Sequence, residues 1–300
     1  MEENAAIAKY KNAAATDDPR MQGWGLLCLA GSHHYGWHDT TIDEFTASVY
    51  YDALIASSAY DSTKARGAGR YATLIARDEK RLRNQFGKFL NLCDLATESD
   101  EINIKLQILK RAAMKLIDDD SFPNDPKRAT MYLETILRDA EDDPTRGDAA
   151  YKLAYCLQIG KAGFTRDPRK ASELHSLVLT YDDPKSEPFS ACCLATMEMG
   201  DNKSTHRDFK RARALYELAL KSPFISDGMR STALFNLGII LSSGGYGTTP
   251  DHPKAYKICD QLDAIGHPKA CELRYFLDRE TGKTVEFIGE KALEAFLSSL

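Results

Sequence analysis

The chain has 300 residues, 43% of them hydrophobic, which is enough apolar material for a substantial core and excludes a disordered polypeptide. Its formal net charge is −5, with both signs interspersed, and this argues against a protein that wraps nucleic acid or coats an anionic membrane. The seven cysteines are odd in number and irregularly spaced, so we expect reduced thiols in the core and no disulfide framework.

The N-terminal residues, Met1-Glu2-Glu3-Asn4, are acidic and have no apolar segment. They therefore predict neither a signal peptide nor a mitochondrial presequence. No apolar run approaches the roughly 20 residues that a membrane-spanning helix needs. Together with the unpaired cysteines, these observations predict a cytoplasmic, reducing location.

The first predicted repeat occupies residues 18–57. Asp18 followed by Pro19 marks a helix start, because aspartate caps helix N-termini and proline is favoured in the first turn. Gly36 is expected to end that helix. A second helix is predicted after Asp43, where apolar residues recur at helical spacing from Ala47 onwards.

A histidine-rich segment, residues 33–38, joins these two helices. His34 and His38 are four positions apart, which would place both on one helix face, and Asp39 could add an oxygen ligand. Gly36 is expected to end the helix between them, however, and no cysteine is near. We therefore expect a loop packed by Trp37 and no metal site.

Residues 58–144 fit the repeat less well. A repeat unit is due near position 84, yet a charged stretch occupies residues 77–83. In the better-fitting repeats, the first helix carries a leucine 14 positions before the aspartate and is followed by a glycine. The helix before Asp125 has neither of these residues. We predict degenerate repeats here, with a degenerate or merged pair of helices between residues 60 and 124.

Residues 145–265 hold the most regular pattern. The segment from Ala150 to Leu157 has apolar residues at i, i+3, i+4 and i+7, and Gly160 follows it. Asp167 and Pro168 then start a helix with the same spacing from Ala171 onwards. The predicted unit is a helix, a loop and a second helix.

A constant interval runs through the whole chain. Five aspartates each stand four positions before an alanine, and the four intervals between them are 82, 42, 41 and 43 residues, the first being twice 41. A fixed period of this size is typical of repeat architectures. The aspartates of this repeat pattern are Asp43, Asp125, Asp167, Asp208 and Asp251.

Four of these aspartates follow a leucine by 14 positions. That leucine precedes a small residue, and a glycine lies six or seven positions after it. The pattern Leu-small-x-x-apolar-x-x-Gly, a loop and Asp-x-x-[Lys/Arg]-Ala resembles the Sel-one-like repeat, a relative of the tetratricopeptide repeat. The basic position holds Arg128, Lys170, Arg211 and Lys254. Tetratricopeptide repeats have 34 residues, so the longer period favours the Sel-one-like variant.

This resemblance implies an all-α fold, a right-handed α-solenoid of antiparallel helix pairs that forms a single helical-repeat domain over residues 1–300. We expect about six helix pairs, with C-terminal capping helices over 266–300. The first of these is predicted at 267–278. The last would be an amphipathic helix that presents Val285, Ile288, Leu293, Phe296 and Leu297.

The predicted partner-binding surface lies on the first helices of the regular repeats, because first helices line the concave side of such stacks. Residues that flank the core positions recur there at equivalent places and would form one strip that takes a partner's peptide or helix. The alternative is that they only pack one first helix on the next. The strip comprises Tyr151, Tyr155, Gln158, Cys192, Thr196, Phe235, Ile239 and Ser242.

The function that the resemblance implies is a non-catalytic scaffold or adaptor for protein–protein interaction. The alternative is a structural subunit of a large multiprotein assembly. No nucleophile has a base at a supporting spacing, and the regular cysteine pairing of relatives linked to β-lactam binding is absent, so an enzyme is not predicted. We expect protein partners, no cofactor, no nucleic acid and no membrane insertion.

Overall fold

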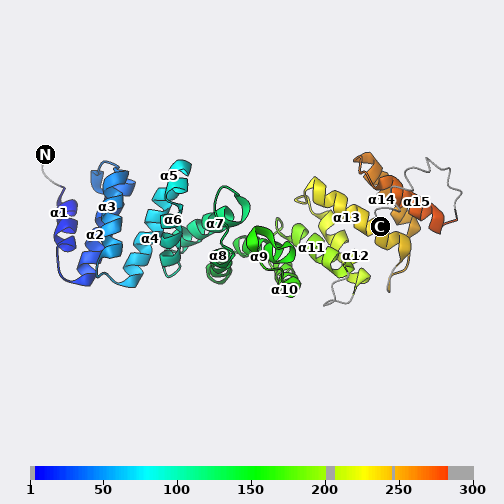
Figure 1. Ribbon diagram of the computed structural model, residues 1–300, viewed down its shortest axis with the longest axis horizontal. Coiled ribbons are helices and arrows are strands. Elements are labelled where there is room, and N and C mark those ends of the chain that lie inside the picture. Colours follow the sequence, from blue (N-terminus) through cyan, green and yellow to red (C-terminus); the bar gives the residue numbers. More distant parts are fainter. Residues whose placement is uncertain (1–3, 201–206, 245–246, 283–300) are drawn as a thin grey trace. The chain divides into compact units, whose positions relative to one another are not determined.

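A computed structural model of the chain describes residues 4–200, 207–244 and 247–282. These residues form helices and connecting loops, with no strand among them, and the fold is an α-solenoid of helix pairs (Figure 1). None of the described helices has both the length and the apolar character needed to cross a bilayer. The chain divides into two compact units, Met1–Asp167 (unit 1) and Pro168–Leu300 (unit 2).

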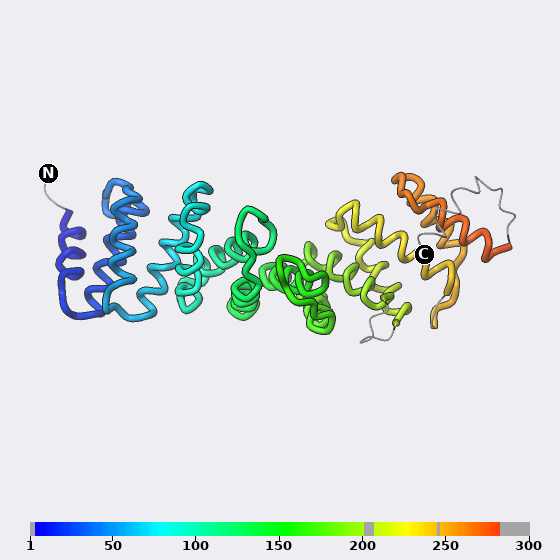
Figure 2. The backbone as a smooth tube through the Cα atoms, in the orientation of Figure 1, coloured from blue at the N-terminus to red at the C-terminus, as the bar shows by residue number. Residues whose placement is uncertain are grey.

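In unit 1 the chain reverses direction between successive long helices, so that neighbours in sequence pack side by side (Figure 2). The first helices of its pairs are α2, α4 and α7, and the second helices are α3, α6 and α8; α9 follows and packs on α8. The elements are α1 (Ala5–Ala14), α2 (Pro19–Tyr35), η1 (Trp37–Asp39), α3 (Glu44–Ala56), α4 (Asp61–Ala76), α5 (Glu79–Asn84), α6 (Phe86–Ala96), α7 (Ile102–Asp118), α8 (Pro126–Asp139), α9 (Asp143–Ile159) and η2 (Lys161–Gly163).

Unit 2 repeats the arrangement with greater regularity. The first helices α11 and α13 each pair with the second helix that follows, α12 and α14, and α13 also contacts α15. The elements are α10 (Pro168–Val178), α11 (Glu187–Met199), α12 (Phe209–Lys221), α13 (Asp227–Ser243), α14 (His252–Ala264) and α15 (Ala270–Glu280). The helix expected at 267–278 is therefore present as α15. The residues expected in a final amphipathic helix, Val285 to Leu297, lie outside the described residues.

The aspartates of the repeat pattern act as helix caps. Asp43, Asp125, Asp208 and Asp251 each accept a backbone N–H from the first turn of a second helix, at N–O distances of 2.9 to 3.1 Å. Such caps stabilise a helix by about 1 kcal/mol each. The alanines that follow are 0% exposed and lie in the core between the helices; they are Ala47, Ala129, Ala171, Ala212 and Ala255.

The glycines after the first helices also have the expected role. Gly36, Gly160 and Gly244 adopt a left-handed conformation with φ between 60° and 76°, and each ends its helix. Gly200 differs, since its φ of −70° is one that any residue adopts. The glycine that comes one position early in the sequence is thus not a left-handed cap.

The irregular middle region contains separate helices and no merged pair. α4 and α6 pack together, and the charged stretch forms the short helix α5 between them. Arg81 of α5 donates to the backbone oxygen of Leu74 at 3.1 Å and pairs with Glu44 of α3 at 2.5 Å. These contacts tie the charged segment to its neighbours, so the helix pairing persists although the repeat pattern is lost.

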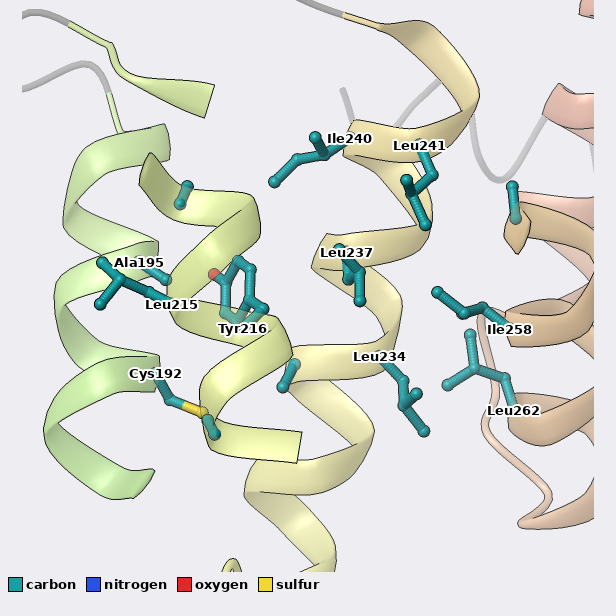
Figure 3. Close-up of a cluster of buried hydrophobic side chains, with 14 of the residues drawn as sticks. Cys192, Ala195, Leu215, Tyr216, Leu234, Leu237, Ile240, Leu241, Ile258 and Leu262 are labelled. Atoms are coloured by element: carbon teal, nitrogen blue, oxygen red, sulfur yellow. The ribbon is translucent and has the colours of Figure 1, made fainter. Parts of the chain in front are cut away.

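The core of unit 2 is a continuous apolar cluster that runs from α11 to α15 (Figure 3). Figure 3 shows Leu215 and Tyr216 of α12 on one side of α13, and Ile258 and Leu262 of α14 on the other. Tyr216 is 0% exposed, and burying an aromatic ring of this size contributes a large apolar area to the fold. Apolar burial is the main force that holds the pairs together.

Candidate protein-interaction surface

The predicted strip begins in unit 1 on α9. The rings of Tyr151 and Tyr155, one helical turn apart, stack with their centroids 6.1 Å apart and an angle of 29° between the planes. Both side chains and Gln158 are half-buried. The backbone oxygen of Gln158 accepts from Nε of Arg166 at 3.0 Å, which fixes the loop after the helix. α9 thus presents an aromatic pair that is partly open to solvent.

In unit 2 the strip includes Thr196, which is exposed on α11. Its hydroxyl donates to the Cys192 backbone oxygen at 2.9 Å, and it also lies 2.9 Å from the Tyr216 hydroxyl. The amide of Asn236 on α13 donates to the same Tyr216 hydroxyl at 2.9 Å. One buried tyrosine of a second helix therefore holds two successive first helices in register.

Phe235 and Ile239 continue the strip on α13, and both are half-buried. The Phe235 ring stacks on His267 with centroids 5.5 Å apart, and the Lys269 ammonium lies 5.7 Å from its centroid. Both residues also pack against the apolar cluster. The face of α13 is consequently apolar, bordered by cationic and aromatic groups, and only partly covered.

Two residues of the predicted strip are not on the surface. Cys192 is 4% exposed and belongs to the apolar cluster, where burial raises the pKa of its thiol to about 12. Ser242 is 6% exposed, and its hydroxyl donates to the Ile239 backbone oxygen at 3.0 Å. These two positions contribute packing, so the accessible part of the strip consists of the other six residues, three on α9 and three on α11 and α13.

The first repeat contributes a strip residue that sequence reasoning missed. The position of α2 equivalent to Tyr155, Thr196 and Ile239 is Gly31, and the Trp37 ring packs directly on it. A Cβ at Gly31 would overlap that ring. Trp37 is 39% exposed. Its ring therefore presents an aromatic surface at the position of Gly31, although Trp37 itself follows α2 in the chain.

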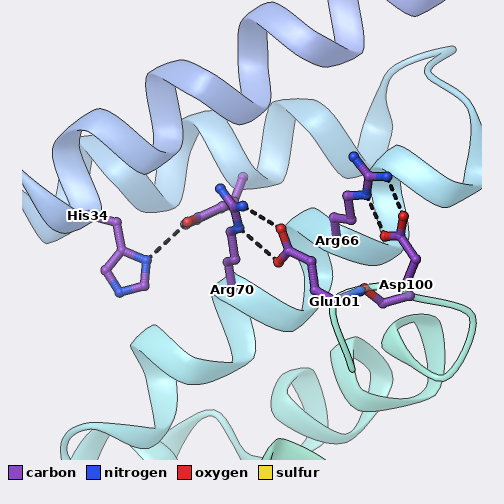
Figure 4. Close-up of polar contacts among 7 residues, drawn as sticks. His34, Arg66, Arg70, Asp100 and Glu101 are labelled. Carbon is purple, nitrogen blue, oxygen red and sulfur yellow. Dashed lines mark hydrogen bonds and ion pairs between the residues drawn. The ribbon is translucent and has the colours of Figure 1, made fainter. Parts of the chain in front are cut away.

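A tyrosine ring and a guanidinium pack against this tryptophan. Tyr35 stacks on Trp37 with centroids 5.2 Å apart, and the Arg70 guanidinium of α4 lies 5.3 Å from the Trp37 ring centroid. Arg70 also forms a two-point ion pair with Glu101, and one of its bonds is 3.0 Å long (Figure 4). A bidentate pair holds the guanidinium plane in place, so the aromatic surface of the first repeat is preorganised.

The histidine-rich segment is a packed loop. Gly36 ends α2, so that His34 and His38 lie in different elements. His34 is 0% exposed and its Nδ1 lies 3.0 Å from the Tyr51 hydroxyl, whereas His38 contacts the Tyr10 hydroxyl at 2.9 Å. In the part of the chain that the structure describes, no group of three or more His, Cys, Asp or Glu side chains is placed to hold a metal ion.

Buried histidines occur in both units. Burial, helped by the positive charge of Arg77, lowers the pKa of His34 to about 4. Burial alone lowers the pKa of His175 on α10 to about 4; its Nδ1 lies 3.2 Å from the Ser190 hydroxyl. Both side chains are therefore neutral at pH 7 and act as core residues. The seven cysteines are free thiols, and six of them are at least partly buried.

The chain contains three Sel1 repeats: a family model described as "Sel1 repeat" matches residues 147–176, 194–222 and 231–259. Two solved structures are similar to it. A Sel1 repeat protein from Oxalobacter formigenes has 12% sequence identity and a TM-score of 0.39, over 87% of this chain and 98% of that chain. The protective antigen c5321 of uropathogenic Escherichia coli, which displays an SLR fold, has 14% identity and a TM-score of 0.35, over 93% of this chain and 68% of that chain. Among curated proteins, none matches the chain.

Proposed function

Because residues 147–259 carry Sel1 repeats, which generally serve as protein-interaction scaffolds, we propose that this chain is a non-catalytic scaffold or adaptor. In each unit it binds a partner protein through the exposed face of the first helices, which in the regular repeats are α9 in unit 1 and α11 and α13 in unit 2. One observation carries the proposal. The equivalent positions of α2, α9 and α13 present aromatic or apolar side chains that the fold leaves partly open: the Trp37 ring above Gly31, Tyr155 and Ile239. On α11 this position holds the exposed Thr196.

The side chains on this face indicate the chemistry of the partner. Tyr151, Tyr155 and Phe235 offer ring faces, and Thr196 offers a hydroxyl. Aromatic side chains are enriched at protein interfaces because they supply a large contact area at a small cost in conformational entropy. A partner segment with apolar anchors at helical spacing, or an extended peptide with alternating apolar residues, fits such a face.

The proposal is tested with the variant Tyr155→Glu/Ile239→Glu and the single variant Thr196→Arg. Thr196 is exposed and lies outside the apolar cluster, although its replacement removes the contact of its hydroxyl with Tyr216. Matched controls are Met131→Glu on α8 and Leu177→Glu on α10, which are 39% and 38% exposed on second helices. Each variant is first compared with wild type by circular dichroism and thermal melting.

Cross-linking mass spectrometry in native lysate then compares the partners. The expected result is that partners cross-linked to wild type are lost from the strip variants and kept by both controls. A strip variant that folds normally and keeps every partner contradicts the proposal.

A permanent structural subunit of a large assembly is the second candidate. Such a subunit would bury its second helices as well, and the exposed apolar face of α3, with Phe45 78% exposed, favours that reading for the first repeat. Size-exclusion chromatography of the purified chain separates the two candidates. An adaptor is expected to elute as a single symmetric peak of low molecular mass. A permanent subunit is expected to aggregate or to be poorly soluble without its assembly.

A further inference from the structure

The second helix of the first repeat, α3, has an outer face unlike that of a surface helix. Phe45 and Val49 are 78% and 50% exposed, and Ile42, just before the helix, is 60% exposed. Ala53 and Ala56 continue the same line towards the C-terminal end and are also exposed. The spacing of these residues, close to four, places them along one side of a helix.

The other repeats provide an internal comparison. At the position of Phe45 the sister helices carry Lys127, Arg169, Lys210 and Pro253. At the position of Val49 they carry Met131, Glu173, Ala214 and Lys257. The architecture of the repeat therefore does not require apolar residues at these places, and the apolar face of α3 is a property of this repeat alone among the five.

α3 already satisfies its own core contacts on its other side. Ala47, Tyr51 and Leu54 are 0% exposed, and α3 packs on α2 and α4. An apolar surface of this kind, left open on a chain of mixed charge, marks an interaction site.

The charges beside the apolar line are paired within the chain. Asp52 accepts from the Lys88 ammonium at 3.0 Å, and Glu44 pairs with Arg81 at 2.5 Å. The face therefore carries little net charge. Two identical faces can meet without repulsion, because a like-with-like contact requires a surface whose charges are already compensated.

Residue sizes along the line are complementary to an inverted copy. Bulky residues occupy the N-terminal half, Phe45 and Val49, and small residues occupy the C-terminal half, Ala53 and Ala56. In an antiparallel pairing of two α3 helices, Phe45 faces Ala56 of the second copy, and Val49 faces Ala53 of the second copy. Large side chains then fill the space that small ones leave, as close helix packing requires.

We propose that the outer face of α3 joins two copies of this chain in an antiparallel, two-fold symmetric contact. The contact is isologous, so each copy supplies the same residues. It lies on a second helix and is independent of the first-helix face assigned to a partner protein. One pair of helices makes a small interface, below about 1,200 Å², so the dimer is reversible, with a dissociation constant of about 1 to 100 μM.

The test is sedimentation equilibrium of the full chain over that concentration range. Wild type is expected to associate as a dimer. Val49→Lys and Ala53→Glu each place a charge against an apolar side chain in both halves of the contact, and each is expected to raise the dissociation constant by at least about 30-fold. Met131→Lys, at the equivalent position of α8 and 39% exposed, is the matched control and leaves association unchanged.

Mixing the two charged variants tests the geometry. In a dimer of one Val49→Lys copy and one Ala53→Glu copy, the antiparallel register sets the new ammonium against the new carboxylate, so association returns in the mixture although neither variant dimerises alone. Wild type that remains monomeric at the highest concentration overturns the proposal, and its α3 face then serves a different partner. A mixture that stays monomeric while wild type dimerises overturns the antiparallel pairing.

Discussion

Units 1 and 2 stack helices in the same way but hold them together with different chemistry. In unit 2 an apolar cluster runs from α11 to α15, and the buried Tyr216 bonds to neutral partners. Unit 2 also buries one carboxylate between its helices, since Glu198 of α11 is 8% exposed and pairs with Arg211 of α12 at 3.0 Å. In unit 1 both partners of an ion pair enter the interior. Lys105 of α7 pairs with Asp139 of α8 at 2.6 Å, with side chains only 6% and 15% exposed, and Tyr132 donates to Asp94 at 2.6 Å. The same architecture therefore tolerates both kinds of core.

The difference explains where the repeat pattern is visible. A helix pair whose core uses Leu and Ala at fixed positions has a recurring sequence pattern. All three matched repeats lie within residues 147–259. A pair held by specific ion pairs, such as Arg70 with Glu101, needs particular charges that no other repeat shares. Between residues 60 and 124 of unit 1 the helices therefore still pair, although the sequence pattern of the repeat is lost.

The largest effect is expected from the buried ion pair of unit 1. Asp139→Ala leaves the Lys105 ammonium buried without its partner, which costs about 3 to 5 kcal/mol of unfolding free energy. Chemical denaturation monitored by circular dichroism measures the loss. Leu177→Ala on α10, at a half-exposed apolar site, provides the unit 2 control and costs far less. A change below about 1 kcal/mol for Asp139→Ala would show that the pair does not hold α7 to α8.

The two buried histidines predict a shared response to acid. In the fold, their pKa of about 4 lies below the ordinary value of 6.5, so the unfolded chain binds a proton that the folded chain rejects. The contribution of these two histidines to stability is therefore constant above about pH 6.5 and falls as the pH drops towards 4, by up to about 3 kcal/mol for each histidine.

Denaturation at pH 7.5 and pH 4.5 tests this response, with His34→Gln for unit 1 and His175→Leu for unit 2. Each replacement removes one titrating group, so the fall in stability between the two pH values becomes smaller. If the double variant loses as much stability as wild type over this range, other groups account for the acid response.

Two helical glycines, Gly25 and Gly228, differ in how closely neighbouring atoms approach them. A Cβ at Gly25 of α2 would stand 2.7 Å from the Tyr10 backbone oxygen and closer still to the Ala14 nitrogen, so Gly25→Ala must push α1 away. We expect a loss of about 1 to 3 kcal/mol and faster hydrogen exchange in α1. Gly228→Ala on α13, with nothing within 4 Å, is the control and is expected to gain about 0.5 to 1 kcal/mol. Equal exchange of α1 in wild type and Gly25→Ala would contradict the close packing.

The sequence predicted those parts of the fold that depend on local rules. The caps at Asp43 and Asp251, the buried Ala171 and the left-handed Gly160 follow from what each residue type does at a helix end or crossing. Between residues 60 and 124 the sequence predicted a degenerate or merged pair of helices and did not decide between them, because contacts such as Arg81 with Glu44 join residues that are far apart in the chain.

The candidate site was predicted in part. Tyr155 and Thr196 were found because equivalent positions repeat, and both remain accessible. The spacing of the sequence did not show that Cys192 is buried. Its position lies beside the core positions of α11, and the exposure of its side chain depends on how the neighbouring helices pack. The sequence did not predict that Trp37 belongs to this surface. Its ring packs back on Gly31 of α2 from a turn in which His38 adopts a φ of 56°, and the sequence pattern does not show such a turn. A glycine in mid-helix, Gly31, was the available signal.

Residue-level cross-linking of the wild-type chain in native lysate shows whether partners bind the first-helix face. The account predicts that cross-links to other proteins concentrate beside the accessible strip, at lysines such as Lys152 on α9 and Lys269 near Phe235. Lysines of the second helices, such as Lys210 and Lys257, should be cross-linked far less. Cross-links spread evenly over first and second helices would contradict the claim and indicate a subunit buried on all sides.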